Sequence, residues 1–267
     1  MHVTKSVKTS LEILDCFTSE TPAIGVTEIS RKLRVSKSTV SRILSTLEQG
    51  GLVAKIPANQ KHRLGAKILQ LAGTFLSTIE WRIIAMPHVK ALRDETNETV
   101  MLFMIDGDHR ICLEGCESAQ ELRSSFAIGG RYPLHAGSAG KLLLASLPQD
   151  AQKRILARAG LPGYTSHTIT GAGELERELA EIREKGYAVS HQERAAFLSS
   201  VSAPIRDFRG EIVAALCVYG PSVRFTPARV REFTRRTLDV AKKISAEIGL
   251  GRERGPEGNP RRPSRAG

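Results

Sequence analysis

The residues best suited to chemistry form a short polar run between Ser36 and Ser45. The same segment repeats apolar residues at Val40, Leu44 and Leu47, which is the i, i+4, i+7 spacing of a helix with one buried face. On the opposite face, small hydroxyls permit close approach to a DNA groove, and cations bind phosphates and base edges. The chemistry predicted here is DNA recognition, by these residues: Ser36, Lys37, Ser38, Thr39, Ser41 and Arg42.

The elements around this run must position it. Thr27 and Ser36 are N-cap residue types that each precede an apolar-periodic stretch, so they predict two consecutive helices. A strand over 52–56, a turn at 57–60 and a return over 61–65 predict a cationic hairpin after the second helix. Helix, helix and hairpin make a winged helix, whose wing would bring these cations to the phosphate backbone: Lys55, Lys61 and Arg63.

An earlier helix over 6–17 completes the predicted N-terminal domain. Its apolar stripe is expected to be Val7, Leu11 and Leu14, facing the other two helices. An ordinary amphipathic helix pair would show the same periodicity, so the helical pattern alone leaves both interpretations open.

A second candidate site surrounds Ser138. Residues 136–140 resemble a loosened nucleophile elbow, but the first glycine of that motif is Ala136 here, and His135 is too near in sequence to be the usual base. A phosphate loop fails as well, because it needs glycine where His135 stands. No catalytic residue is assigned. The remaining interpretation is a helix N-terminus whose free N–H groups bind an anion.

Segment patterns divide the rest of the chain. The predicted domains are a winged helix-turn-helix over 1–65, a linker helix over 66–80, an α+β domain over 81–249 and a disordered basic tail over 250–267. The linker exposes more apolar surface than a spacer needs, including Phe75 and Leu76, so we expect it to pack on a partner. In the third segment, helices alternate with strands, and one strand is expected over 122–128.

The composition agrees with a DNA-binding domain attached to a larger domain. The net charge is +11, and residues 1–64 hold ten Lys/Arg against five Asp/Glu, whereas residues 65–249 are nearly balanced. No apolar run approaches the length of a membrane span, and no signal peptide is visible, so a cytoplasmic protein without membrane association is expected. Cys112 and Cys116 lack a second ligand pair at metal-site spacing, so neither metal nor cofactor is predicted.

Several motifs, taken together and in order over residues 5–249, make the sequence resemble the IclR family of bacterial transcriptional regulators. The motifs are Lys37-Ser38-Thr39-Val40, Gly51-Leu52-Val53, Pro133-Leu134-His135-Ala136, Gly140-Lys141, Gly186-Tyr187-Ala188-Val189, Ala203-Pro204-Ile205-Arg206-Asp207 and Gly220-Pro221. The family usually has glycine where this chain has Arg34, so Arg34 is expected to adopt a left-handed conformation, at a cost of about 1 kcal/mol.

The resemblance implies a GAF-like effector domain, pairing of linker and N-terminal domains into a homodimer or a dimer of dimers, and a palindromic operator in double-stranded DNA. It also implies a small-molecule pocket lined by Ser138, Ala139, Ser190, Leu198, Ser200, Cys217 and Tyr219. Members that bind very small acids often have Asp, Cys and Ser at the positions of Ser190, Ser200 and Tyr219, which favours a different, aromatic carboxylate here. The sequence therefore predicts a one-component regulator whose effector changes operator binding. A Ser138-centred hydrolase and a ligand-independent architectural DNA binder stay open as alternatives.

Overall fold

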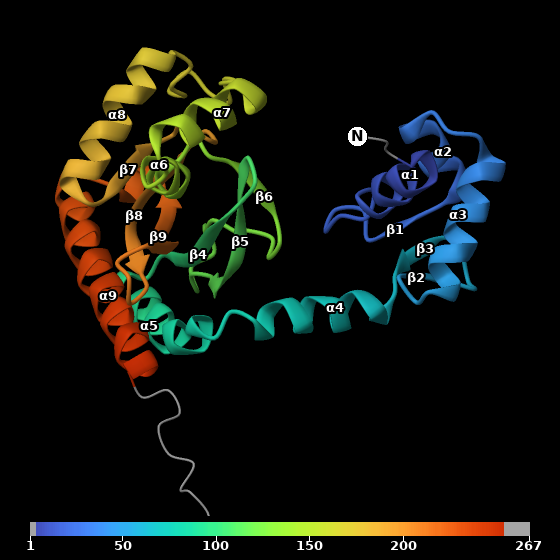
Figure 1. The fold of residues 1–267 in the computed structure, drawn as a ribbon, viewed down its shortest axis with the longest axis horizontal. Coiled ribbons are helices and arrows are strands. Elements are labelled where there is room, and N and C mark those ends of the chain that lie inside the picture. Colours follow the sequence, from blue (N-terminus) through green and yellow to red (C-terminus); the bar gives the residue numbers. More distant parts are fainter. Residues whose placement is uncertain (1–3, 254–267) are drawn as a thin grey trace, which may run out of the picture. The chain divides into compact units, whose positions relative to one another are not determined.

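The computed structural model describes residues 4–253 and divides the chain into two compact units, with the boundary along the chain between Glu80 and Trp81 (Figure 1). The first unit contains α1 (Lys5–Leu14), β1 (Ala23–Ile24), α2 (Val26–Leu33), α3 (Lys37–Gln49), β2 (Val53–Lys55), β3 (His62–Leu64) and α4 (Ala66–Ser77). Its strands form an antiparallel sheet in the order β1-β3-β2, and β2 and β3 make the wing. The predicted winged helix-turn-helix is confirmed, with Val40, Leu44 and Leu47 of α3 in its core.

Two details of the first unit differ from the sequence prediction. Helix α2 begins at Val26 after an N-cap at Gly25, not at Thr27, because the Glu28 carboxylate turns back to accept the Gly25 N–H at 2.7 Å. In α1 the buried face is Ile13 with Thr9, and Cys16 follows it. Of the predicted stripe, Leu14 packs against this core, whereas the prediction was wrong for Val7 and Leu11, which are exposed.

The first unit exposes apolar side chains on two helices. Val7 and Leu11 of α1 are 57% and 58% exposed. Helix α4, the predicted linker, has no buried residue, and Leu69 is 77% exposed and Phe75 46% exposed. Apolar surface concentrated in this way marks an interaction face.

The second unit is built on a six-stranded antiparallel sheet in the order β6-β5-β4-β9-β8-β7. Its helices are α5 (Trp81–Thr96), α6 (Ser138–Ala145), α7 (Gln149–Ala159), α8 (Ala172–Lys185) and α9 (Pro227–Glu253). Its strands are β4 (Thr99–Asp106), β5 (His109–Cys116), β6 (Arg131–Pro133), β7 (Ala188–His191), β8 (Leu198–Arg206) and β9 (Ile212–Pro221), with a 3-10 turn, η1, over Ser222–Arg224.

Helices cover both faces of this sheet, as Figure 1 shows. Helices α6 and α8 pack on the face that carries Met101, Phe103 and Tyr219. Val100 and Leu102 point the other way, toward α5 and α9, and are also fully buried. This explains why β4 reads as a continuous apolar run, and the structure confirms the predicted GAF-like α+β arrangement.

Three sequence expectations for the second unit need correction. Residues 122–128 form no strand, because only Phe126 turns inward while Leu122 and Ile128 are 65% and 64% exposed. The edge strand is β6 instead. Helix α7 was not predicted, since it buries only Gln152 and Ile155. Helix α9 runs to Glu253, past the boundary expected at 249, and the rest of the predicted tail lies outside the described residues. None of the helices described between residues 4 and 253 has both the length and the apolar character of a membrane span.

Candidate functional site

The N-terminus of α3 is organised by Ser36. Its Oγ accepts the Thr39 N–H at 3.2 Å, and it lies 3.0 Å from the Ser38 hydroxyl and 2.9 Å from the Thr39 hydroxyl. The predicted N-cap is therefore confirmed, and this cap fixes the first turn of the helix. The outward face of α3 keeps Lys37, Ser38, Ser41 and Arg42 exposed.

The turn before α3 adopts the conformation expected from the sequence. Arg34 has φ 55° and ψ 39°, which is left-handed. The Ser30 Oγ donates to the Val35 carbonyl at 2.7 Å, and the Val35 N–H donates to the Ser30 carbonyl at 3.2 Å. These hydrogen bonds hold Arg34 in a conformation that favours glycine.

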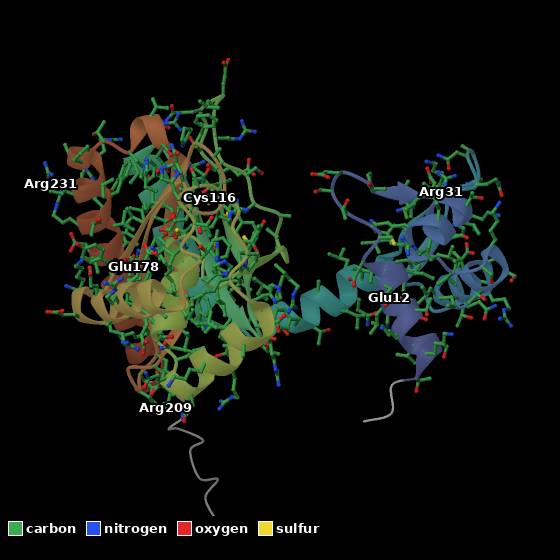
Figure 2. The ribbon with its side chains drawn as sticks, turned by 90° about the horizontal axis from the view of Figure 1, so that it is seen from above. Glu12, Arg31, Cys116, Glu178, Arg209 and Arg231 are labelled. Atoms are coloured by element: carbon green, nitrogen blue, oxygen red, sulfur yellow. The ribbon has the colours of Figure 1, made fainter. Side chains whose placement is uncertain are left out.

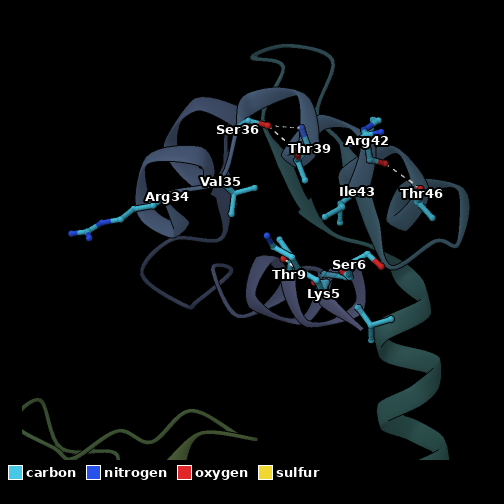
Figure 3. Close-up of a pocket in the computed structure, with 12 residues that line it drawn as sticks. Lys5, Ser6, Thr9, Arg34, Val35, Ser36, Thr39, Arg42, Ile43 and Thr46 are labelled. Atoms are coloured by element: carbon cyan, nitrogen blue, oxygen red, sulfur yellow. Dashed lines mark hydrogen bonds between the residues drawn. The ribbon is translucent and has the colours of Figure 1, made fainter. Parts of the chain in front are cut away.

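A groove of about 840 Å³ runs between α1 and α3 (Figure 3). Lys5 lines it from α1, and Thr39 and Arg42 line it from α3. Arg34 also lines it from the turn, although its guanidinium points away from the other labelled residues (Figure 3). Lys5 and Arg42 beside hydroxyl-bearing walls suit a sugar-phosphate backbone.

A second groove, of about 610 Å³, lies between the start of α2, the other flank of α3 and the wing. Ser41, Lys55 and Lys61 line it, so the structure brings together one helix residue and two wing cations of the predicted DNA-binding set. The Lys61 Nζ already lies 3.2 Å from the Glu28 Oε1. The Gly25 N–H and Lys61 both lower the pKa of Glu28. Arg63 is exposed. The free positive charge of the wing is thus smaller than the sequence suggests.

In the second unit, Ser138 lies at the centre of a buried hydroxyl cluster. Its Oγ donates to the Ser200 Oγ at 2.7 Å, lies 2.8 Å from the Ser202 Oγ and is 3.3 Å from the Cys217 Sγ. Ser138 is the first residue of α6, so the cluster joins this helix to β8 and β9. Burial raises the pKa of Cys217, which is therefore a neutral thiol at pH 7.

The strand register explains why residues distant in sequence meet here. Ser200 pairs across the sheet with Tyr219 on one side and with Ser190 on the other. Leu198 is two residues from Ser200, and alternate residues of a strand share a face. The structure therefore gathers the predicted pocket residues on one face of the sheet beside α6, where Ala139 is also fully buried.

The arrangement that a serine hydrolase needs is not formed around Ser138. Its hydroxyl contacts only hydroxyls and a thiol among the described residues, and the His135 Nε2 lies 3.0 Å from the Pro162 carbonyl oxygen. A nucleophile requires a base within hydrogen-bond reach. No group of three or more His, Cys, Asp or Glu that could hold a metal occurs within residues 4–253.

The carboxylate of Glu193 occupies part of the expected anion site. Glu193 accepts the Gly137 N–H at 3.0 Å, and it also binds the Lys141 Nζ at 2.6 Å. The Lys141 Nζ also lies 2.6 Å from the Oε1 of Glu178 on α8, which is labelled in Figure 2. Sequence reasoning named the Gly140-Lys141 motif but not this buried ion cluster.

Arg110 of β5 is a buried cation that sequence reasoning missed. It is fully buried, and its Nη1 donates to the Pro133 carbonyl and, at 3.0 Å, to the Ala136 carbonyl. Its Nε and Nη2 have no partner among the described residues. The signal was present in the sequence, since a single arginine interrupts the apolar strand that includes Cys112 and Leu113.

The glycines flanking Ser138 make room for this guanidinium. An added Cβ at Gly137, which has φ 87°, would lie 3.2 Å from the Arg110 Nη2. A Cβ at Gly140 would collide with the Arg110 Nη1 and lie 2.7 Å from the Leu134 carbonyl oxygen. The elbow-like spacing of these glycines is therefore explained by the close approach of Arg110 and, at Gly140, of backbone carbonyl oxygens.

Comparison with known proteins identifies the family. The model for the IclR helix-turn-helix domain matches residues 6–57, and that for the bacterial transcriptional regulator IclR C-terminal domain matches residues 73–246. The chain belongs to the IclR family of bacterial transcriptional regulators. It combines the family's DNA-binding helix-turn-helix domain with its C-terminal effector domain.

Curated relatives span nearly the whole chain. The transcriptional repressor IclR of Escherichia coli is 30% identical over 247 residues, covering 92% of this chain and 90% of the relative. The regulator KdgR of the same species is 33% identical over 226 residues, covering 85% and 86%. These relatives are named as transcriptional regulators.

Solved structures share the fold. IclR of Thermotoga maritima has a TM-score of 0.74 at 29% identity, covering 91% of this chain and 98% of that one. An IclR homologue of Microbacterium hydrocarbonoxydans, complexed with 4-hydroxybenzoate, has a TM-score of 0.81 at 22% identity, covering 92% and 100%. The second comparison supports the fold alone.

Proposed function

We propose that this IclR-family member is a one-component regulator acting in the cytoplasm, in which a small organic acid bound to the second unit changes binding of a palindromic operator. The observation that carries the proposal is the exposed hydroxyl and cation face of α3, presented by a family-typical winged helix. Arg42, Lys37 and Ser38 are the residues we place in the major groove, because they point away from the buried stripe of α3. Lys55 and Arg63 serve as phosphate contacts from the wing, with a smaller contribution from Lys61.

Operator selection tests this assignment. The full chain is incubated with a pool of random duplexes, and bound sequences are amplified and aligned. A palindromic consensus with two half-sites is expected, because a two-fold protein imposes its symmetry on the DNA. Binding without sequence preference would instead identify the architectural alternative.

The exposed apolar faces of α1 and α4 support a homodimer. Leu69 and Phe75 are the α4 residues we place between subunits, since such surface is rarely left to solvent. Sedimentation of the full chain and of Leu69→Glu provides the test. The wild type is expected to sediment as a dimer or a dimer of dimers, and the variant to dissociate at lower concentrations. A wild-type monomer at micromolar concentration would contradict the assembly.

The effector is proposed to bind where α6 meets β8 and β9. The buried hydroxyls of Ser138 and Ser200 and the unpartnered donors of Arg110 support this location. An effector shifts operator affinity only through its different affinity for two arrangements of the dimer. Recovery of a bound acid chemically unchanged after incubation is expected, whereas turnover of an acid or ester would favour the hydrolase alternative.

A further inference from the structure

Arg110 and Arg194 bring two guanidiniums toward one aromatic ring in the second unit. The Cζ of Arg110 lies 5.7 Å from the centroid of Tyr132, and that of Arg194 lies 5.0 Å from it. An added Cβ on Gly137 would be 3.2 Å from the Arg110 Nη2 and 3.9 Å from the Arg194 Cβ, so both side chains flank the same glycine. Burial, together with the nearby charge of Arg110, lowers the pKa of Arg194.

Arg110 stands out because the other buried charges of this unit are compensated. Glu98 binds the Arg224 Nη2 at 2.7 Å, and Lys141 binds Glu193 at 2.6 Å. Within residues 4–253, no carboxylate forms an ion pair with Arg110 or Arg194. Placing a charge in a protein interior without a counter-charge is costly, so an anion bound beside Arg110 would offset that cost.

The unpartnered atoms of Arg110 have the geometry that a carboxylate recognises. Nε and Nη2 form one edge of the guanidinium, and both are buried without a partner. Two parallel N–H groups on one edge can donate to the two oxygens of a carboxylate in a bidentate fork. The Tyr219 hydroxyl is also buried and makes no hydrogen bond of normal geometry among the described residues, although the Cys217 thiol lies beside it.

Aromatic rings surround these donors. The centroid of Phe126 lies 4.4 Å from that of Tyr219 and 5.5 Å from that of Tyr132, and Phe103 lies edge-on to all three rings at 5.7–5.9 Å. Rings at this spacing favour another aromatic ring in edge-to-face or offset contact. Arg194, which is only half-buried, lies over Phe126 at 5.3 Å, so the accessible side of the cluster is on the loop that follows β7.

We infer that Arg110, Arg194 and Tyr219 form a subsite for the carboxylate of a small aromatic acid, held among the rings of Phe103, Phe126 and Tyr132. The inference rests on the proposed function, because it gives the chemical class of the effector. Arg110 binds the carboxylate edge-on, Tyr219 donates a further hydrogen bond, and Arg194 moves from its place over Phe126 to pair with the acid. The Ser138 cluster adjoins this subsite, since Cys217 and Tyr219 lie on the same face of β9.

Calorimetry and thermal unfolding of the full chain test the inference with benzoate and phenylacetate. Their neutral amides, benzamide and phenylacetamide, match them in shape, and pyruvate is a small acid without a ring. At least one aromatic acid is expected to bind and to raise the Tm, while its amide has no effect and pyruvate binds more weakly. No shift with either aromatic acid, or an equal shift with its amide, would overturn the inference.

Variants then assign the binding to these guanidiniums. Arg110→Met and Arg194→Met are each expected to weaken binding of the aromatic acid at least about tenfold, or 1.4 kcal/mol. Arg194 makes no ion pair or hydrogen bond within the described chain, so Arg194→Met remains informative if Arg110→Met fails to fold. Arg131→Met is the matched control, because its guanidinium is 53% exposed and pairs with Asp106 on the edge of the sheet. Equal affinity of all three variants for the acid would exclude the subsite.

Operator binding separates this inference from the proposed function. If pyruvate but no aromatic acid changes operator affinity, the proposed regulatory function is supported and the aromatic subsite is wrong. If the chain binds no operator yet binds benzoate through Arg110, the subsite is supported and the proposed regulatory function is wrong.

Discussion

The two units place positive charge in opposite surroundings. On α3, the side chains of Lys37 and Arg42 extend into solvent. Beside α6, the guanidinium of Arg110 is fully buried, and that of Arg194 is half-buried. Exposed cations are screened by salt and act by displacing counterions from a polyanion, whereas buried cations are screened much less and bind an anion that fits their geometry. The proposed function, in which one chain binds both a long polyanion and a single small acid, depends on this difference.

The largest effect is expected when a buried cation that has a counter-charge is removed from the second unit. Lys141→Met is expected to lower the free energy of unfolding by about 3–5 kcal/mol, because it leaves the buried Glu193 carboxylate without its partner. Arg194→Met is expected to change stability much less. Urea unfolding of both variants provides the measurement.

Lys185→Met is the control for this pair of variants, since Lys185 forms an exposed pair with Glu181 within α8. If Lys141→Met proved as mild as the control, the distinction between compensated and uncompensated buried charge would be lost.

The next largest effect is expected on the exposed side. Arg42→Ala should cost about 1–3 kcal/mol of operator binding and relax base preference at one position of each half-site. Fluorescence anisotropy with the selected operator and a scrambled duplex measures both. Arg183→Ala on α8 is the control of equal charge, and wild-type affinity of Arg42→Ala would mean that α3 does not enter the groove as proposed.

A smaller effect is expected in the wing. Arg63→Ala should weaken binding to all duplexes alike and reduce the magnitude of the salt slope by about one. Lys61→Ala should have less effect on the slope, because Glu28 already offsets part of its charge. Titrations at several salt concentrations compare the two variants, and a larger slope change for Lys61→Ala would show that the pair with Glu28 opens on DNA.

The smallest effect concerns acid stability and His135. Burial lowers the pKa of His135 below its ordinary value of 6.5, so the folded chain favours the neutral ring. As the pH falls below 6.5, the unfolded chain binds a proton that the folded chain resists, and stability decreases. His135→Gln is expected to reduce this loss between pH 7 and pH 5 in urea titrations. His62 of the first unit, whose pKa is also lowered by burial, should leave a residual slope. An unchanged slope would exclude His135 as a contributor.

Sequence reasoning succeeded where local chemistry decides the structure. The cap at Ser36 and the stripe of Val40, Leu44 and Leu47 follow from short-range spacing, and the left-handed Arg34 follows from the glycine that the family usually has at that position. In the second unit, family motifs selected residues that strand register brings together, such as Ser200 and Tyr219. Their role in binding stays a prediction.

The errors arose where long-range packing decides. Which face of α1 is buried depends on how it packs on α3. Val7 and Ile13 are both apolar, so the residue types alone do not show which of them is buried. Phe126 was assigned to a strand over 122–128, but its inward position depends on a ring cluster formed with distant strands. Arg110 could be noticed in the sequence, whereas its lack of a counter-charge depends on which side chains the fold brings beside it.

The close approach at Gly140 also constrains how this domain can change over evolutionary time. A substitution of glycine by alanine requires one nucleotide change, yet the added methyl group would displace the Arg110 guanidinium. The same methyl group would lie 2.7 Å from the Leu134 carbonyl oxygen and 2.8 Å from that of Pro133, and these backbone atoms remain whichever residue stands at 110. An alignment of descendants should therefore keep glycine at 140 even in sequences that have lost arginine thirty positions earlier in the chain.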